Sequence, residues 1–280
     1  MTHGSRTDDA RQAWEAVAPA WERHRNRMFT SSRAVSQWLV DQLDPGPGQT
    51  ILELTAGPGD TGFLAAERVG PEGRLISSDL APAMVDIARR GAAEHGIDNV
   101  EFRVIDAQRI DLPDDSVDGV LSRFGLMFVP EPVRAFGEIR RVLRPGGRLA
   151  YAVWGTPERN MWIGLMMCAL IQNGFAPPGD AFAPGGVVSL AGAERNRELL
   201  AGAGFSDVRV TEVAGAMPFA DLEDYWAVQT AVAGPVAQLV ASMTPEQVAA
   251  VKATLEPSMA PYQSDDGYGL PSLATVVRAT

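Results

Sequence analysis

The 280-residue sequence contains one cysteine, Cys168, and only three histidines. A single cysteine excludes an intrachain disulfide framework and a cysteine-rich metal site, so we expect no bound metal. The longest apolar run, Met161 to Ile171, is too short to cross a bilayer. The first ten residues lack the apolar segment of a secretory signal. We therefore expect a cytoplasmic protein without a membrane span.

Positive charge is also scarce. The chain has 24 Lys and Arg residues against 35 Asp and Glu residues, which gives a net charge of −11. A nucleic-acid binder depends on neutralising phosphates, so this balance argues against a nucleic-acid partner. The 46% hydrophobic content is ordinary for a globular protein. Abundant Ala, Gly and Arg with few Lys is typical of a GC-rich bacterial genome.

Strand-like and helix-like segments alternate along most of the chain. Strands are expected at residues 50–55, 73–79, 100–105, 117–122, 148–154, 206–213 and 271–279. Helices are expected at 8–28, 31–43, 60–68, 81–94, 130–143 and 192–203, with one more in 157–190 and two or three in 221–266. Strands separated by helices indicate a parallel sheet with right-handed crossovers. We predict an α/β fold, a doubly wound and mostly parallel sheet of seven strands.

Helical additions divide the chain further. We expect N-terminal helices over 1–44, a ligand-binding core over 45–156 and a helical cap insertion over 157–191. The remainder of the core, 192–280, carries a helical insertion at 221–266 and the final strand. Pro19 is expected to kink or split the first helix, because proline cannot donate the helical hydrogen bond.

The segment ILELTAGPGDTG, residues 51–62, is the most informative part of the sequence. A strand runs directly into glycines and then into a helix, a geometry that lets backbone N–H groups approach a ligand. Asp79 and Asp106 end the next two strands. Their carboxylates can hold ribose hydroxyls and an exocyclic amine. The pattern therefore indicates an adenosine derivative.

The sequence of this loop fits two classes of ligand. Gly57, Gly59 and Gly62 match the GxGxxG pattern of dinucleotide sites, and Asp79 has the spacing that such sites require. An NAD(P)-dependent oxidoreductase is therefore an alternative. Glu53 in the first strand and Asp60 in the loop suit a positively charged ligand better than a pyrophosphate.

Further motifs follow in order: IDAQRIDLP at 105–113, LRPGG at 143–147 and AGAGFSDVRV at 201–210. With them the chain resembles the class I S-adenosylmethionine-dependent methyltransferases, in the branch similar to the ubiquinone/menaquinone-biosynthesis C-methyltransferases. The resemblance covers about residues 45–215, and AVAPAWERHR at 16–25 resembles the first helix of the family.

This resemblance implies a Rossmann-like methyltransferase fold, S-adenosylmethionine as cofactor and an N-terminal helical lid. It also implies a small, hydrophobic or aromatic acceptor, methylated on O, N or C in quinone-like or secondary metabolism. A non-catalytic cofactor-binding regulator is the non-enzymatic alternative. A homodimer is left open.

The resemblance also assigns residues. The implied cofactor-binding residues are Glu53, Thr55, Ala56, Gly57, Gly59, Asp79, Leu80, Met84, Asp106, Ala107 and Ser122. The implied acceptor-binding residues are Trp21, Arg123, Phe124, Trp162 and Met166. The family usually has a glycine where this chain has Thr55. His24 is the candidate general base, because the first helix of similar enzymes closes over the substrate.

Other roles stay open for some of these positions. Asp79 could cap the helix that follows it, and Asp106 could cap a turn. Glu53 is either an electrostatic partner of the cofactor's amino group or a structural anchor of the loop. The apolar stretch from Met161 to Ile171 is either core or a substrate lid, since Met-rich surfaces adapt to irregular ligands.

Overall fold

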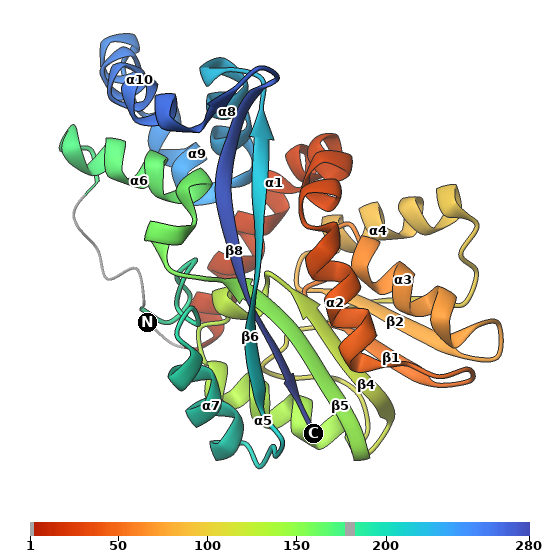
Figure 1. The fold of residues 1–280 in the computed structure, drawn as a ribbon. Coiled ribbons are helices and arrows are strands. Elements are labelled where there is room, and N and C mark those ends of the chain that lie inside the picture. The colour runs from red at the N-terminus through yellow and green to blue at the C-terminus, as the bar shows by residue number, and fades with distance from the viewer. Residues whose placement is uncertain (1–2, 177–182) are drawn as a thin grey trace.

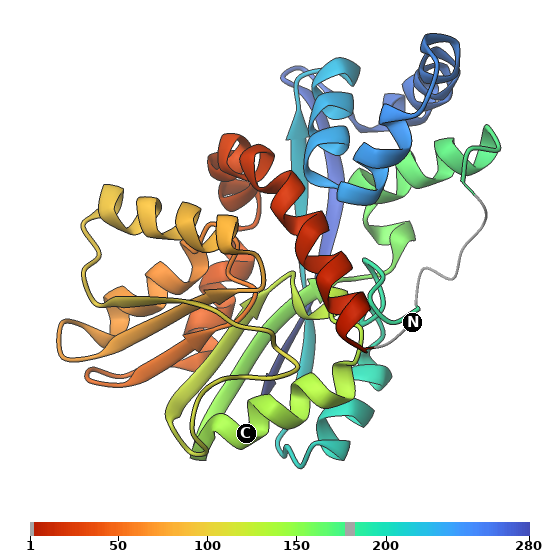
Figure 2. The same cartoon turned by 180° about the vertical axis from the view of Figure 1, so that it is seen from behind.

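The computed structural model describes residues 3–176 and 183–280, and its centre is one sheet with helices on both faces (Figures 1 and 2). Its strands are β1 (Thr50–Glu53), β2 (Arg74–Asp79), β3 (Val100–Val104), β4 (Val117–Arg123), β5 (Leu143–Trp154), β6 (Arg209–Phe219), β7 (Gln263–Ser264) and β8 (Gly267–Ala279). Seven strands follow the order β3-β2-β1-β4-β5-β8-β6, and β7 pairs with β8 off this path. The pairs from β3 to β5 are parallel, whereas β8 is antiparallel to β5 and β6. The predicted fold class is confirmed.

The helices of the described chain form two layers and a cap. They are α1 (His3–Ser31), α2 (Arg33–Leu43), α3 (Asp60–Val69), α4 (Pro82–His95), α5 (Pro132–Val142), α6 (Met161–Gln172), α7 (Ala193–Gly202), α8 (Leu222–Val232), α9 (Gly234–Ala241) and α10 (Pro245–Met259). Short 3₁₀ turns lie at η1 (Leu126–Phe128), η2 (Pro157–Arg159) and η3 (Ala260–Tyr262). In Figure 1, α2, α3 and α4 cover one face of the sheet, and α5 and α7 cover the other.

Successive residues of β1 belong to two different hydrophobic clusters, one on each face of the sheet. Ile51 belongs to the cluster that holds Leu39 of α2 and Phe63 of α3. Its neighbour Leu52 belongs to the cluster that holds Phe136 of α5. Because successive side chains of a strand point to opposite faces, both faces of β1 are buried under helices.

Two long strands extend beyond the sheet and carry the cap. β6 and β8 stay paired from Arg209 opposite Arg278 to Phe219 opposite Tyr268. Both are longer than expected, since the predicted strands covered only 206–213 and 271–279. Ladder hydrogen bonds to β8 hold the second half of β6, where the sequence has no strand-like alternation. Helices α6, α8, α9 and α10 gather at this end (Figure 1), which is the carboxyl end of the parallel strands.

The N-terminal helix lies between the sheet and the cap. α1 runs through Pro19 as one helix, so of the predicted kink or split, the split is wrong. It passes below the cap helices (Figure 2) and contacts α4, α8 and α9. These contacts on several sides compensate for the one hydrogen bond that proline removes.

Two other expectations concern the inserted segments. The two or three helices expected in 221–266 are three, α8, α9 and α10. The loop rich in Gly and Pro in the expected cap insertion lies partly outside the described residues, which omit 177–182. None of the described helices is both long enough and apolar enough to cross a bilayer.

Candidate functional site

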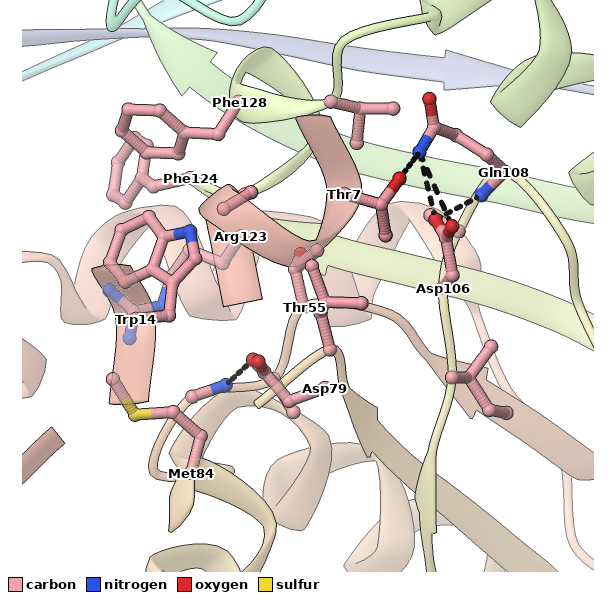
Figure 3. Close-up of a pocket in the computed structure, with 18 of the residues that line it drawn as sticks. Thr7, Trp14, Thr55, Asp79, Met84, Asp106, Gln108, Arg123, Phe124 and Phe128 are labelled. Atoms are coloured by element: carbon pink, nitrogen blue, oxygen red, sulfur yellow. Dashed lines mark hydrogen bonds between the residues drawn. The ribbon is translucent and has the colours of Figure 1, made fainter. Parts of the chain in front are cut away.

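A cavity of about 90 Å³ lies at the carboxyl ends of the parallel strands, where ligands of doubly wound sheets bind (Figure 3). The loops after β1, β2, β3 and β4 form its floor, and α1 forms its roof with Thr7, Ala10, Trp14 and Trp21. Of the predicted cofactor residues, those on the lining are Thr55, Ala56, Gly57, Asp79, Leu80, Met84, Asp106 and Ala107. Residues of three separate loops, from Thr55 to Ala107, therefore lie around one cavity.

The glycine loop is closed by its own hydrogen bonds. The Gly57 amide donates to Asp79 Oδ2 at 2.9 Å, and the Gly59 amide donates to the Ala56 carbonyl at 3.0 Å. The expectation that these two amides face a ligand is therefore not supported. The glycines are needed for another reason, because φ is +54° at Gly57 and +85° at Gly59, a region that only glycine adopts without strain.

Asp79 connects the glycine loop to α4. Its Oδ1 accepts a hydrogen bond of 3.0 Å from the Ala81 amide, beside the bond of Oδ2 to Gly57. The side chain is 8% exposed and lines the cavity. Burial raises the pKa of Asp79, while hydrogen bonds from the backbone of Ala81, Gly57 and Leu80 act in the opposite direction. Asp79 therefore acts as a turn cap and also presents a carboxylate to the cavity.

Asp106 is held by Gln108, which was not among the predicted site residues. The Gln108 side-chain nitrogen lies 3.0 and 3.3 Å from the two Asp106 oxygens and 3.4 Å from Thr7 Oγ1 (Figure 3). The other end of the same amide accepts from the Glu131 backbone at 3.1 Å. Gln108 thus joins Asp106 to α1 and to the start of α5.

Glu53 lies behind the loop and not on the cavity lining. It is 1% exposed, its Oε1 accepts from the Gly62 amide at 2.8 Å, and Ser77 Oγ lies 3.3 Å from Oε2. Burial raises the pKa of Glu53 to about 8, against the opposing effects of the Gly62 amide and Arg123. Glu53 was expected to be either a partner of the cofactor's amino group or a structural anchor of the loop. Because its carboxyl binds an amide in the first turn of α3, the structure shows the anchor.

Thr55 and Phe124 face the cavity in a strained backbone conformation. Their φ angles are +54° and +57°, which is uncommon for any side chain with a Cβ and an outlier for a β-branched one. The hydrogen bond of 2.7 Å between Thr55 Oγ1 and Ser122 Oγ holds this arrangement, and Ser122 is otherwise buried beneath the lining. The positive φ explains why a glycine suits the position of Thr55.

Gly125 leaves the space that the Thr55 side chain fills. A Cβ built on Gly125 lies 1.9 Å from Thr55 Oγ1. We expect Gly125→Ala to lower the free energy of unfolding by about 1–3 kcal/mol, the usual range for overpacking. In a Thr55→Gly background the same change meets no threonine side chain and should cost much less. Urea unfolding of the four proteins measures this coupling, and additive effects would contradict it.

Aromatic rings form the wall of the cavity that lies away from Asp106 (Figure 3). Trp14 meets Phe128 edge-on at 5.1 Å and Trp21 at 6.4 Å, and all three line the cavity. Phe124, also on the lining, stacks on Trp154 with ring centroids 3.6 Å apart. Trp14 and Phe128 were not predicted as site residues. The spacing of Trp14 and Trp21 on one helix does not show which of them contacts the loop that holds Phe128.

The apolar helix α6 lies behind this wall. Trp162 is 5% exposed and contacts Trp154 at 5.0 Å, and Met166 is 1% exposed. Neither side chain is on the lining of the cavity. Of the two alternatives for this helix, these positions show the packing of core.

His24 lies outside the cavity, on the side of α1 that faces α8. Burial lowers the pKa of His24, and the charges of Arg27 and Arg23 lower it further, while Asp224 opposes them. Arg27 donates to Asp224 at 2.8 Å. This position gives His24 no contact with the lining in the described structure.

Asp60 is neutralised within the protein. Its Oδ1 lies 2.8 Å from Nη2 and 2.9 Å from Nε of Arg25, a side chain of α1 that is 9% exposed. Asp60 was expected to favour a positively charged ligand, but the Arg25 guanidinium already provides its positive partner. Arg123 lines the cavity, as predicted, and is positively charged.

Among the described residues, no group of three or more His, Cys, Asp or Glu side chains is arranged to hold a metal ion.

Comparisons with known proteins show the family of the chain. A family model described as "Methyltransferase domain" matches residues 45–161. An arsenite methyltransferase of Halobacterium salinarum is 43% identical over 37% of this chain and 27% of its own length. The aklanonic acid methyltransferase of a Streptomyces species is 32% identical over 54% of this chain and 67% of its own. A ubiquinone/menaquinone biosynthesis C-methyltransferase of Hahella chejuensis is 33% identical over 45% and 51%.

Solved structures support the fold. The YcgJ protein of Bacillus subtilis superposes with a TM-score of 0.60 at 16% identity, over 88% of this chain and 97% of that protein. At that identity the similarity shows the fold alone. The chain spans only about a quarter to two thirds of the curated relatives named above.

Proposed function

Because the chain belongs to the S-adenosylmethionine-dependent methyltransferases, we propose that it transfers the methyl group of this cofactor to a small hydrophobic or aromatic acceptor. The observation that carries the proposal is one cavity that brings carboxylates and aromatic rings together. Asp79 and Asp106 line it, as do Trp14, Trp21 and Phe128. In Figure 3, the end with Asp106 lies away from the end with Trp14 and Phe128.

The residues around the two carboxylates fit the nucleoside of the cofactor. Asp79 accepts hydrogen bonds in this position already and would hold the ribose hydroxyls. Asp106 would hold the adenine amine, with Gln108 fixing its orientation. Leu80, Met84 and Ala107 supply the apolar surface between them.

The chemistry requires alignment more than proton transfer. The bound cofactor supplies a methyl group already activated on a sulfonium. Positioning can lower a barrier by roughly 7–11 kcal/mol, whereas a placed general base gives about 10²–10⁴-fold. The aromatic wall can align a flat acceptor and exclude water. The proposal therefore assigns no step to His24, and an amine, phenolate or activated ring carbon suits this site best.

The relatives suggest several acceptors, and the cavity favours some of them. Aromatic walls suit the acceptors of the aklanonic acid and quinone-biosynthesis enzymes. Arsenite favours soft thiolate partners. The described lining has no cysteine, and Cys168 is exposed on α6. We therefore place the acceptor among carbon compounds.

Two measurements test the proposed function. Calorimetry should show binding of S-adenosylhomocysteine to the wild-type protein, and a trideuteromethyl-labelled cofactor should add a labelled methyl group to a member of a phenol, hydroquinone and amine panel. Binding of NAD with none of S-adenosylhomocysteine would support the oxidoreductase instead. Cofactor binding without transfer to any acceptor would support the regulator.

We also propose that the N-terminal half of α1 is a lid. Pockets for drug-sized ligands are roughly 300–1,000 Å³, so the cofactor needs more room than the cavity of about 90 Å³ offers. The C-terminal half of α1 is fastened by Arg25 to Asp60 and by Arg27 to Asp224. The N-terminal half contributes Thr7 and Trp14 to the roof.

Hydrogen exchange should locate this motion. Amides of residues 7–18 are expected to exchange faster than those of 24–31 in the free protein and to slow by at least about tenfold with S-adenosylhomocysteine, because the ligand stabilises the closed helix. Pro19 separates the two segments and removes one helical hydrogen bond between them. Equal exchange in both segments, unchanged by ligand, would contradict the lid.

A further inference from the structure

Arg123 is fixed at the end of β4 by two hydroxyl groups. Its Nε donates to Thr61 Oγ1 at 2.8 Å, and its Nη1 donates to Ser32 Oγ at 2.8 Å. The guanidinium lies over the Phe124 ring, 5.6 Å from its centroid. Two neutral acceptors and one ring hold the group in place, and the charges of Asp60 and Glu53 favour its protonated form from a distance. Arg123 also lines the cavity.

No carboxylate of the described chain forms an ion pair with Arg123. The two nearby acidic residues are otherwise engaged, since Asp60 pairs with Arg25 and Glu53 binds the Gly62 amide. Burial raises the pKa of Glu53 to about 8, so Glu53 is mostly uncharged at neutral pH. An arginine cannot lose its proton in a protein. A fixed cation therefore lines the cavity without an ion pair to a carboxylate of the described residues, although the charge of Asp60, and of Glu53 when it is ionised, acts on it.

The cavity offers few other partners for an anion. Among the described residues of its lining, Asp79 and Asp106 carry negative charge and Arg123 carries positive charge. The amides of Gly57 and Gly59, which could have bound an anion, donate instead to Asp79 and to the Ala56 carbonyl. In Figure 3, Arg123 and Asp106 lie on opposite sides of Thr55. The anion site is thus at the end of the cavity away from the proposed adenine contact.

We infer that Arg123 binds the carboxylate of the methionine part of S-adenosylmethionine. The inference rests on the proposed function and changes the role expected for Arg123, which was acceptor binding. The cofactor carries a carboxylate at the end opposite its adenine, and an arginine fork matches a carboxylate in shape and charge. A carboxylate there also separates two positive groups, the guanidinium and the sulfonium, that would otherwise repel each other.

Two ligands that differ only at this end test the inference. S-adenosylhomocysteine and 5′-methylthioadenosine share the nucleoside and the sulfur, but the second lacks the amino-acid carboxylate. Calorimetry on Arg123→Gln should show about ten- to a hundredfold weaker binding of S-adenosylhomocysteine, as for a lost charge-assisted hydrogen bond. Binding of 5′-methylthioadenosine should stay within about twofold and also shows that the variant is folded. Arg123→Lys, which keeps the charge without the fork, should fall between the two.

Other results overturn the inference in separate ways. Equal weakening of both ligands assigns Arg123 a structural role. Undiminished binding of S-adenosylhomocysteine, with a raised KM for an acceptor alone, assigns the anion to the acceptor. Arg197→Gln, on the exposed surface of α7, is the matched control and should leave both affinities unchanged. Failure of the wild type to bind either ligand would refute the proposed function itself, which keeps the two failures distinct.

Discussion

Asp79→Ala is expected to weaken binding of S-adenosylhomocysteine by roughly 10²–10⁴-fold, since each hydrogen bond to a charged group contributes about 1.5–3 kcal/mol and the ribose would lose two. The change also releases the Gly57 and Ala81 amides, which now bond to the two oxygens of Asp79. The loop and the nucleoside contact are lost together. Isothermal titration calorimetry of the wild type and the variant measures the effect.

Two further variants separate these contributions. Asp79→Asn keeps one acceptor oxygen of the same size and should bind more tightly than Asp79→Ala but more weakly than the wild type. Asp86→Ala removes an exposed carboxylate of α4 that pairs with Arg89, and should leave binding unchanged. An Asp79→Ala protein that is folded by circular dichroism and binds with wild-type affinity would refute the ribose role. If Asp79→Ala weakened binding no more than Asp86→Ala does, the ribose role would be refuted as well.

The sequence was sufficient to predict the sheet and one end of the cavity, because both depend on local patterns. Alternating strands and helices leave a parallel doubly wound sheet as the compact arrangement. In such a sheet the residues that end β1 and β2 lie side by side, so Gly57 and Asp79 could be placed together without coordinates. The acidic residue ending the next strand, Asp106, follows by the same reasoning.

The roof of the cavity could not be predicted in this way. Trp14 and Thr7 reach the site only because α1 packs between the sheet and the cap, and Gln108 joins Asp106 to α1 only because Thr7 lies within reach. These contacts join residues about 100 positions apart, and periodicity on one helix does not specify the partner of each face. The second half of β6 was missed for the same reason, since its strand conformation comes from pairing with β8.

Local charge was also misleading where a partner came from a distant element. Asp60 looked available for a positive ligand until α1 placed Arg25 against it. Glu53 looked like a residue of the site because it immediately precedes the loop, yet its side chain points to the Gly62 amide in α3. In both cases the sequence gives the residue type and its neighbours along the chain, whereas the role depends on which charge or amide the fold brings to it.

Glu53 should make the protein less stable as the pH rises. Its pKa of about 8 in the folded protein lies above the ordinary 4.5, because burial disfavours the charged form. The folded state then binds more protons than the unfolded state between these two values, so the stability is complete below about pH 4.5 and is lost as the pH rises through 8. Gly62 approaches so closely that a Cβ there would lie 2.2 Å from Glu53 Oε2, which leaves no room for water to relieve the burial.

Glu53→Gln should remove this dependence, because the amide has the shape of the protonated carboxyl and can still accept from Gly62 and donate to Ser77. Urea unfolding between pH 5 and pH 8 should show the wild type losing about 2–4 kcal/mol relative to the variant, from 1.36 kcal/mol per pH unit over most of that interval. Asp79 adds a loss of the same sign in both proteins, since burial raises its pKa too, and so cancels in the difference. Glu67→Gln, an exposed position of the same helix α3, should follow the wild-type curve. Parallel curves for wild type and Glu53→Gln would show that Glu53 stays ionised in the fold, held by the α3 amide and Arg123 despite its burial.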